Sequence, residues 1–144
     1  MARLLDVNVL VALFIPEHEH HAAAMKWFSN EAAIAGWATC VITELGAIRV
    51  CAQLPGGLWP PEATADRLLM LTISNRGYVW WPETVSPAVV PEVRSAGTAK
   101  HVTDRYLLGL ARQNGGQVVT FDRALAVAGG DDVIGLLPVG GEVP

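Results

Sequence analysis

Four acidic residues interrupt segments that are otherwise strongly apolar: Asp6, Glu44, Asp104 and Asp122. A carboxylate that leaves water for apolar surroundings is destabilising unless it is paired, hydrogen-bonded or bound to a metal ion. One such acid is explained by the end of a strand or helix. Four of them in a chain of 144 residues indicate that their side chains meet at one site. A divalent cation is the simplest ligand for such a site.

The chemistry of such a cluster follows from its ligand type. Carboxylates and waters are hard oxygen ligands that suit Mg²⁺ or Mn²⁺ rather than zinc. Magnesium keeps several waters and takes one or two carboxylates together with phosphate oxygens of a substrate. Bound in this way, the ion polarises a phosphoryl group, lowers the pKa of a bound water and stabilises the leaving oxygen. The reaction class that fits best is hydrolysis of a phosphodiester.

Each acid also has a purely structural explanation. Asp6 is a good N-cap for a following helix. Asp104 follows the expected cap Thr103 and would interact favourably with the positive end of the helix dipole. Glu44 would lie on the solvated face of an amphipathic helix, and Asp122 would be a turn acid paired with a neighbour. The metal-site hypothesis therefore depends on the set of four and not on any single member.

The elements around the acids alternate between short apolar runs and helical spacing. Residues 7–14 continue the first strand as apolar helix or strand. We expect strands at 4–6, 34–39, 78–81, 117–120 and 133–137, and helices at 17–31, 43–53, 61–73, 87–96 and 104–113. This alternation predicts one α/β domain over residues 1–144, with a central parallel sheet of four to five short strands flanked by helices on both faces.

This architecture would bring the acids together. Asp6 and Asp122 follow the carboxyl ends of strands, whereas Glu44 and Asp104 lie in the first turns of helices. Ligands of open α/β sheets bind outside the carboxyl ends of the strands. The sequence therefore predicts one acidic cluster at that edge.

Composition limits the partners. Hydrophobic residues make up 51% of the chain and charged residues 17%, so we expect apolar surface that is covered by a second copy, in a homodimer, or by another protein. The net charge of −4 argues mildly against a nucleic-acid partner. That objection weakens if the four embedded acids neutralise cations, because the rest of the chain carries 10 basic and 10 acidic residues.

Other features exclude several classes of protein. The apolar runs are too short to span a membrane, and no signal-peptide pattern is present, so we expect a cytoplasmic protein. Cys40 and Cys51 have no second pair and no adjacent histidine, which favours buried reduced thiols over a zinc site.

The histidines and tryptophans are weaker candidates. His18, His20 and His21 resemble a metal-binding tract but are expected on an exposed helical stretch away from the acids, and His101 is expected on the surface. The tryptophans are expected in the core or at an interface, with base stacking as the alternative; they are Trp59, Trp80 and Trp81.

The four acidic segments resemble the motifs of PIN-domain ribonucleases, and the chain as a whole is most similar to the VapC toxins of bacterial toxin–antitoxin pairs. The resemblance extends from Arg3 to about Leu137. It rests on Leu4-Leu5-Asp6-Val7-Asn8-Val9-Leu10, Thr43-Glu44-Leu45, Thr103-Asp104-Arg105-Tyr106-Leu107 and Thr120-Phe121-Asp122-Arg123. One departure is Ala124-Leu125, where the family often has glycine and an aromatic residue, and this affects the expected loop conformation.

The resemblance implies a role for each matching residue. Asp6, Asp104 and Asp122 would hold Mg²⁺, for which Mn²⁺ could substitute. Glu44 would complete the acidic pocket, partly through water. Asn8 and Thr120 would support the metal ligands through hydrogen bonds.

The same resemblance implies an endoribonuclease toxin that acts on structured RNA, such as tRNA or ribosomal RNA, and is inhibited by a VapB-like antitoxin. The antitoxin would place its C-terminal segment in an apolar groove between the helices at 17–28 and 61–73, and a basic side chain in the acidic pocket.

Two alternatives remain open at this stage. A haloacid-dehalogenase-like phosphatase also places an aspartate at the end of its first strand, but it needs a second aspartate two residues later, where Asn8 stands. A catalytically silent PIN module that only binds is the other alternative, and the presence of all four acids argues against it.

Overall fold

A parallel five-stranded sheet in the order β3-β2-β1-β4-β5 forms the centre of the computed structural model, which describes residues 1–137. The predicted α/β fold class is confirmed. The fifth strand was predicted over 133–137 but ends at Gly135. The strands are β1 (Arg3–Leu5), β2 (Trp37–Thr39), β3 (Tyr78–Trp80), β4 (Gln117–Thr120) and β5 (Val133–Gly135).

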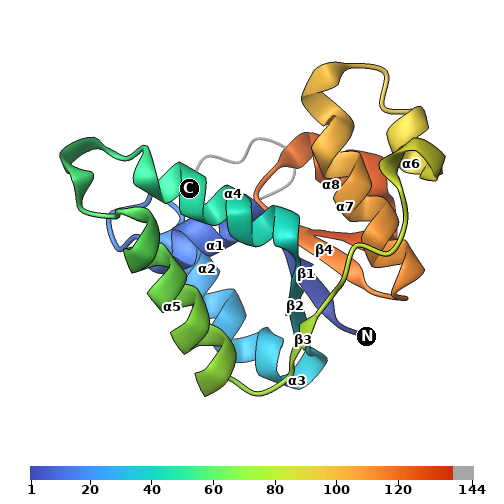
Figure 1. The fold of residues 1–144 in the computed structure, drawn as a ribbon. Coiled ribbons are helices and arrows are strands. Elements are labelled where there is room, and N and C mark those ends of the chain that lie inside the picture. Colours follow the sequence, from blue (N-terminus) through green and yellow to red (C-terminus); the bar gives the residue numbers. More distant parts are fainter. Residues whose placement is uncertain (138–144) are drawn as a thin grey trace.

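Helices cover both faces of this sheet. In Figure 1, α1, α2, α4 and α5 lie on one side of the strands, and α6, α7 and α8 lie on the other. The helices are α1 (Val7–Phe14), α2 (His21–Trp27), α3 (Ala33–Ala35), α4 (Val41–Ala52), α5 (Pro61–Ser74), α6 (Pro91–Arg94), α7 (Val102–Gln113) and α8 (Arg123–Gly129). None of the helices in residues 1–137 is long and apolar enough to cross a membrane.

Alternate residues of the central strands build two cores. Leu5 and Val119 pack into the core on the α1 side, and Leu4 and Val118 into the core on the α7 side. Successive side chains of a strand point to opposite faces of the sheet, so strands buried on both faces read as continuous apolar runs. Cys51 belongs to the first core; it and Cys40 are buried without a disulfide, as predicted.

Several predicted boundaries were wrong for local reasons. The helix predicted over 87–96 is split into a 3₁₀ turn and α6, because Pro91 holds Val90 in an extended conformation. Thr103 does not cap α7, which begins one residue earlier at Val102. The strand predicted from Ile34 starts only at Trp37, after a glycine with a positive φ of 82° ends α3.

Two other differences concern whole segments. Residues 7–14, whose apolar run fits either a helix or a strand, form α1. The helix predicted over 17–31 starts only at His21, then continues as a π-helical stretch over 28–32 and as α3. The helix α8 was not predicted at all.

The sheet register aligns the ends of β1 and β4. Leu5 pairs with Val119, so Asp6 and Thr120 follow as neighbours at the same edge. Helix α4 approaches α1 closely at Gly46, where a Cβ atom would lie 2.4 Å from Val7 Cγ2. These two contacts bring α4, the start of α1 and the end of β4 to one place.

Candidate active site

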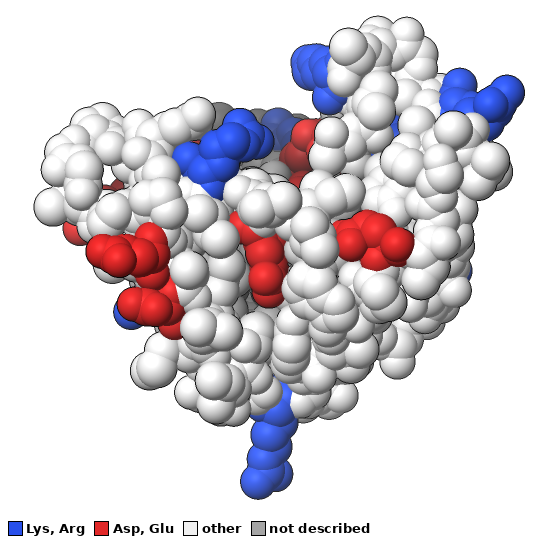
Figure 2. All heavy atoms as spheres, in the orientation of Figure 1, with Lys and Arg blue, Asp and Glu red and all other residues white. Residues whose placement is uncertain are grey.

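Three of the four predicted acids line one pocket at the carboxyl edge of the sheet. Asp6 comes from the end of β1, Asp104 from the first turn of α7 and Asp122 from the start of α8. The pocket has a volume of about 330 Å³, and its other lining residues are Val7, Asn8, Val11, His18, Arg49, Val50, Thr103 and Leu107. Figure 2 shows acidic side chains in the hollow between the two groups of helices and basic side chains on its rims.

Asp6 is fixed by hydrogen bonds to both carboxylate oxygens. The N–H of Val7 donates to Oδ1 at 2.7 Å, and the hydroxyl of Thr120 donates to Oδ2 at 2.7 Å. Only 5% of Asp6 is exposed. Burial raises the pKa of Asp6 and the charge of Asp122 adds to this, whereas the bonds from Thr120 and Val7 oppose the rise. This side chain also caps α1, so its capping role and its place in the pocket coexist.

Thr120 and Asn8 connect Asp6 to the loop that carries Asp122. The amide of Asn8 donates to Thr120 Oγ1 at 3.2 Å, and the N–H of Asp122 donates to the same oxygen at 3.0 Å. The N–H of Phe121 donates to Asn8 Oδ1 at 3.1 Å. These bonds hold the acids of β1 and of the loop after β4 in a fixed relation.

Asp104 carries the clearest electrostatic signature of the pocket. Its pKa is raised from 3.8 to about 6, first by burial and then by the charges of Asp6 and Asp122 and by a hydrogen bond with Asp122; Arg105 opposes the rise. Within residues 1–137, none of these three acids has a basic side chain within 4.0 Å. The negative charge of the pocket is therefore not neutralised by neighbouring cations.

The donor set fits a hard divalent cation that keeps much of its water. Among the residues that the structure describes, no three His, Cys, Asp or Glu side chains stand in a ready ligand arrangement. A magnesium ion needs only one or two direct carboxylates and completes its octahedron with water and substrate oxygens. Three uncompensated carboxylates around one pocket match this requirement better than they match zinc.

Glu44 does not line this pocket. Its carboxylate accepts a hydrogen bond from the hydroxyl of Thr39 at 2.8 Å, and that hydroxyl lies 2.8 Å from the hydroxyl of Tyr78. Thr39 ends β2, the strand next to β1. Glu44 is thus at the same edge of the sheet but one strand away from Asp6, and its role as the fourth acid stays a prediction.

One histidine was placed wrongly by sequence reasoning. His18 lines the acid pocket instead of lying away from it. Pro16 is followed by turns rather than by a helix, and α2 starts only at His21, so His18 stays in the turn between α1 and α2. The apolar spacing after Pro16 resembles a helix and gives no sign of this turn. His101 does not line the pocket.

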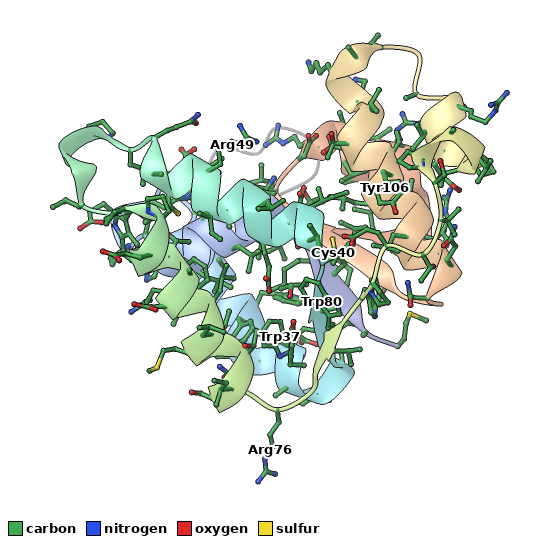
Figure 3. The ribbon with its side chains drawn as sticks, in the orientation of Figure 1. Trp37, Cys40, Arg49, Arg76, Trp80 and Tyr106 are labelled. Atoms are coloured by element: carbon green, nitrogen blue, oxygen red, sulfur yellow. The ribbon has the colours of Figure 1, made fainter. Side chains whose placement is uncertain are left out.

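Arg49 is a second pocket residue that the sequence did not reveal. It is exposed on α4, and Figure 3 shows it on the upper rim of that helix. The pocket also touches Val50, the next residue of the same helix. A single arginine on a helix surface carries no distinctive pattern, so only the packing of α4 against α1 assigns it to the pocket.

A separate apolar groove lies between α2 and α5, where the groove was predicted. Its volume is about 370 Å³, and its lining residues are Leu13, Phe14, Met25, Phe28, Ser29, Arg67, Met70, Leu71 and Asn75. Apolar side chains are also exposed on α4, α5 and the edge strand β3, among them Leu45, Ile73 and Trp80. Trp81, by contrast, is buried in the core on the α7 side.

Known proteins share both the sequence and the fold of this chain. The PIN domain family matches residues 3–130. Ribonuclease VapC39 of Mycobacterium tuberculosis is 40% identical over 132 residues, which cover 88% of this chain and 92% of that protein. Ribonuclease VapC38 of the same organism is 41% identical over 122 residues, covering 83% of this chain and 84% of that protein.

A solved structure described as a toxin–antitoxin complex from Klebsiella pneumoniae has the same fold. Its TM-score is 0.56, and the match covers 96% of this chain and 100% of that chain at 16% sequence identity. The family match, the identity to the VapC ribonucleases and the acids at the carboxyl edge of the sheet agree with one another. The chain belongs to the PIN domain family and, within it, to the VapC ribonucleases.

Proposed function

We propose that this protein is a Mg²⁺-dependent endoribonuclease, the toxin of a toxin–antitoxin pair, and that its active site is the pocket of Asp6, Asp104 and Asp122. The observation that carries the proposal is the convergence of three carboxylates that no basic side chain of residues 1–137 neutralises. The pKa of Asp104 is raised first by burial and then by the charges of Asp6 and Asp122, which belong to the same excess of negative charge. A bound divalent cation would remove it.

Each residue has a defined task in this site. Asp6 presents its oxygens in an orientation fixed by Val7 and Thr120, and Asp104 and Asp122 supply the remaining charge. A bound Mg²⁺ would activate the attacking water and stabilise the leaving oxygen. The hydrogen bonds among Asn8, Thr120 and Phe121 keep the carboxylates in place, so little reorganisation is needed when the substrate arrives.

Glu44 enters the proposal as a carboxylate that acts through water. It lies beyond Thr39 and does not line the pocket, so a direct bond to the metal is not assigned to it. The bond from Thr39 holds its carboxylate in one orientation, which suits a group that orders solvent at the edge of the site.

The proposed substrate is structured RNA of the tRNA or ribosomal RNA class. The relatives are named as ribonucleases. Arg49 on the rim of the pocket offers a cation for the RNA backbone, and phosphate contacts dominate the affinity of proteins for nucleic acids. Such RNA is cytoplasmic, and we place the activity there.

The proposed partners are a VapB-like antitoxin and a second copy of the chain. The groove between α2 and α5 is lined by Leu13, Phe14, Met25, Phe28 and other residues, and it suits the apolar face of a helix. An antitoxin arginine in the acid pocket would neutralise the carboxylates in place of the cation. The exposed apolar side chains of α4, α5 and β3 support a homodimer.

Membership of the PIN domain family excludes a haloacid-dehalogenase-like phosphatase. The remaining alternative is a catalytically silent PIN module that only binds. The test is cleavage of total tRNA and ribosomal RNA by the purified protein in MgCl₂, followed on denaturing gels. We expect fragments with wild-type protein and none with Asp6→Asn or in excess EDTA. Undiminished cleavage in EDTA would refute the metal mechanism, and a lack of cleavage under all conditions would support the silent module.

A further inference from the structure

The turn between α1 and α2 places His18 at the acid pocket and is held by two contacts at its α2 end. His21 Nδ1 lies 2.7 Å from the carbonyl oxygen of Ala12, which attaches the turn to α1. The ring of His20 stacks on Phe121 with the centroids 4.6 Å apart and an angle of 15° between the planes. Because Phe121 directly precedes Asp122, the turn is packed against the loop that carries one of the acids.

This anchored turn fixes the imidazole of His18 in one tautomer. The N–H of His20 donates a hydrogen bond to His18 Nδ1 at 3.0 Å. A ring nitrogen that accepts a bond carries no proton, so the neutral ring has its proton on Nε2. Within residues 1–137, Nε2 of His18 has no hydrogen-bond partner, although the residue lines the pocket of the three acids.

The surroundings of His18 favour this neutral form. Burial lowers the pKa of His18, and the neighbouring His20 and His21 act in the same direction, with Glu19 opposing them. A protonated imidazole would also have to break the bond from the His20 backbone. A neutral donor can face the acids without pairing with them as a cation would, so it leaves the carboxylates free for a metal ion.

We propose that His18 Nε2–H donates a hydrogen bond to a non-bridging phosphate oxygen of the RNA and thereby positions the scissile phosphodiester over Asp6, Asp104 and Asp122. The inference rests on the proposed ribonuclease function and names a substrate contact for it. Phosphate oxygens only accept hydrogen bonds, and the three acids repel them. Asn8 already donates one amide N–H to Thr120, and the other side chains of the pocket that can donate to a phosphate are His18, the exposed Arg49 and Thr103. Of these, the ring of His18 is held by its turn with its proton on Nε2.

Two substitutions of His18 separate its structural role from its substrate contact. In His18→Asn, the side-chain oxygen can accept the bond from the His20 N–H, as asparagine does in turns, but the Nε2 donor is lost. In His18→Gln, the amide nitrogen takes the place of Nε2 as a donor. His101→Asn is the matched control, because His101 does not line the pocket.

The experiment measures kcat and KM for a short fluorogenic RNA in MgCl₂, together with the melting temperature of each variant. We expect His18→Asn to melt like the wild type and to lose about tenfold or more in kcat/KM, the size of a lost hydrogen bond to a charged group, mainly through KM. His101→Asn should stay close to the wild type, and His18→Gln should recover most of the activity that His18→Asn loses. The pH profile of His18→Gln should match that of the wild type, because the donor does not titrate during the reaction.

The results that overturn the inference differ from those that overturn the proposed function. Wild-type kinetics in His18→Asn would show that there is no phosphate contact. Loss of one limb of the pH profile in His18→Gln would show that His18 transfers a proton instead. If wild-type protein does not cleave RNA, or if Asp6→Asn cleaves as well as the wild type, the ribonuclease site itself is wrong and the inference falls with it.

Discussion

Replacing Asp104 by asparagine should stabilise the metal-free protein at neutral pH while abolishing its activity. The pKa of Asp104 is raised from 3.8 to about 6 by burial and by Asp6 and Asp122. At about 1.36 kcal/mol per pKa unit, the shift corresponds to about 3 kcal/mol against folding at pH 7. Because the side chain is only half-buried, solvent screening reduces this to roughly 1–2 kcal/mol.

The sign of this effect depends on pH. Below 3.8 the carboxyl group is protonated in both the folded and the unfolded state, so its raised pKa does not oppose folding. Between 3.8 and about 6 the folded state binds more protons, so the stability of the metal-free wild type falls as the pH rises. Above about 6 the full effect is present. Asp104→Asn should therefore gain stability over the wild type at pH 7.5 and little at pH 4.

Thermal unfolding in EDTA at these two pH values is the assay. For a chain of this length, a gain of 1–2 kcal/mol raises the melting temperature by about 3–8 °C. Asp66→Asn, which removes an exposed acid on α5, is the control and should change little. MgCl₂ should stabilise the wild type by binding the folded state and should leave Asp104→Asn nearly unchanged. A variant that is less stable than the wild type at pH 7.5 in EDTA would refute the reasoning.

Four further outcomes follow from the same geometry. Thr120→Val should lower the free energy of unfolding by about 1–3 kcal/mol, because it leaves Asp6 and the N–H of Asp122 without their partner. Urea titration measures this loss, and the control Thr120→Ser should be close to the wild type. The value of kcat/KM at limiting Mg²⁺ should fall as the pH drops through about 6, because Asp104 must be ionised to hold the cation; a flat rate between pH 5 and 8 would contradict this. Glu44→Gln should lower kcat by less than Asp6→Asn, since Glu44 lies outside the pocket, and an unchanged kcat would remove it from the site. Light scattering at tens of micromolar should give the mass of a homodimer, and a strictly monomeric mass would rule this association out.

The sequence predicted the sheet well because its strands are buried on both faces. Leu4, Leu5, Val118 and Val119 all pack into a core, and such strands appear as short continuous apolar runs. The convergence of Asp6 and Asp122 at one edge follows from the parallel direction of β1 and β4. Asp104 lies at the start of a strongly amphipathic helix, which can be recognised from its spacing.

The parts that the sequence did not predict depend on contacts between distant segments. Glu44 was assigned to the cluster by the type of residue and its place in a first helical turn. Its actual direction is set by Thr39 and Tyr78, a contact that residue spacing does not encode. His18 was assigned to an exposed helix, whereas the stacking of His20 on Phe121 holds its turn at the pocket. In both cases tertiary packing, and not local propensity, decides where the side chain lies.

Direct titration with Mn²⁺ tests most sharply whether the three carboxylates form one cation site. Calorimetry at pH 7.5 on the wild type should show binding that is lost in Asp6→Asn and in Asp104→Asn and is weakened at pH 5, where Asp104 is largely protonated. Asp66→Asn should bind like the wild type. Absence of binding to the wild type, or equal binding by Asp6→Asn, would contradict the account.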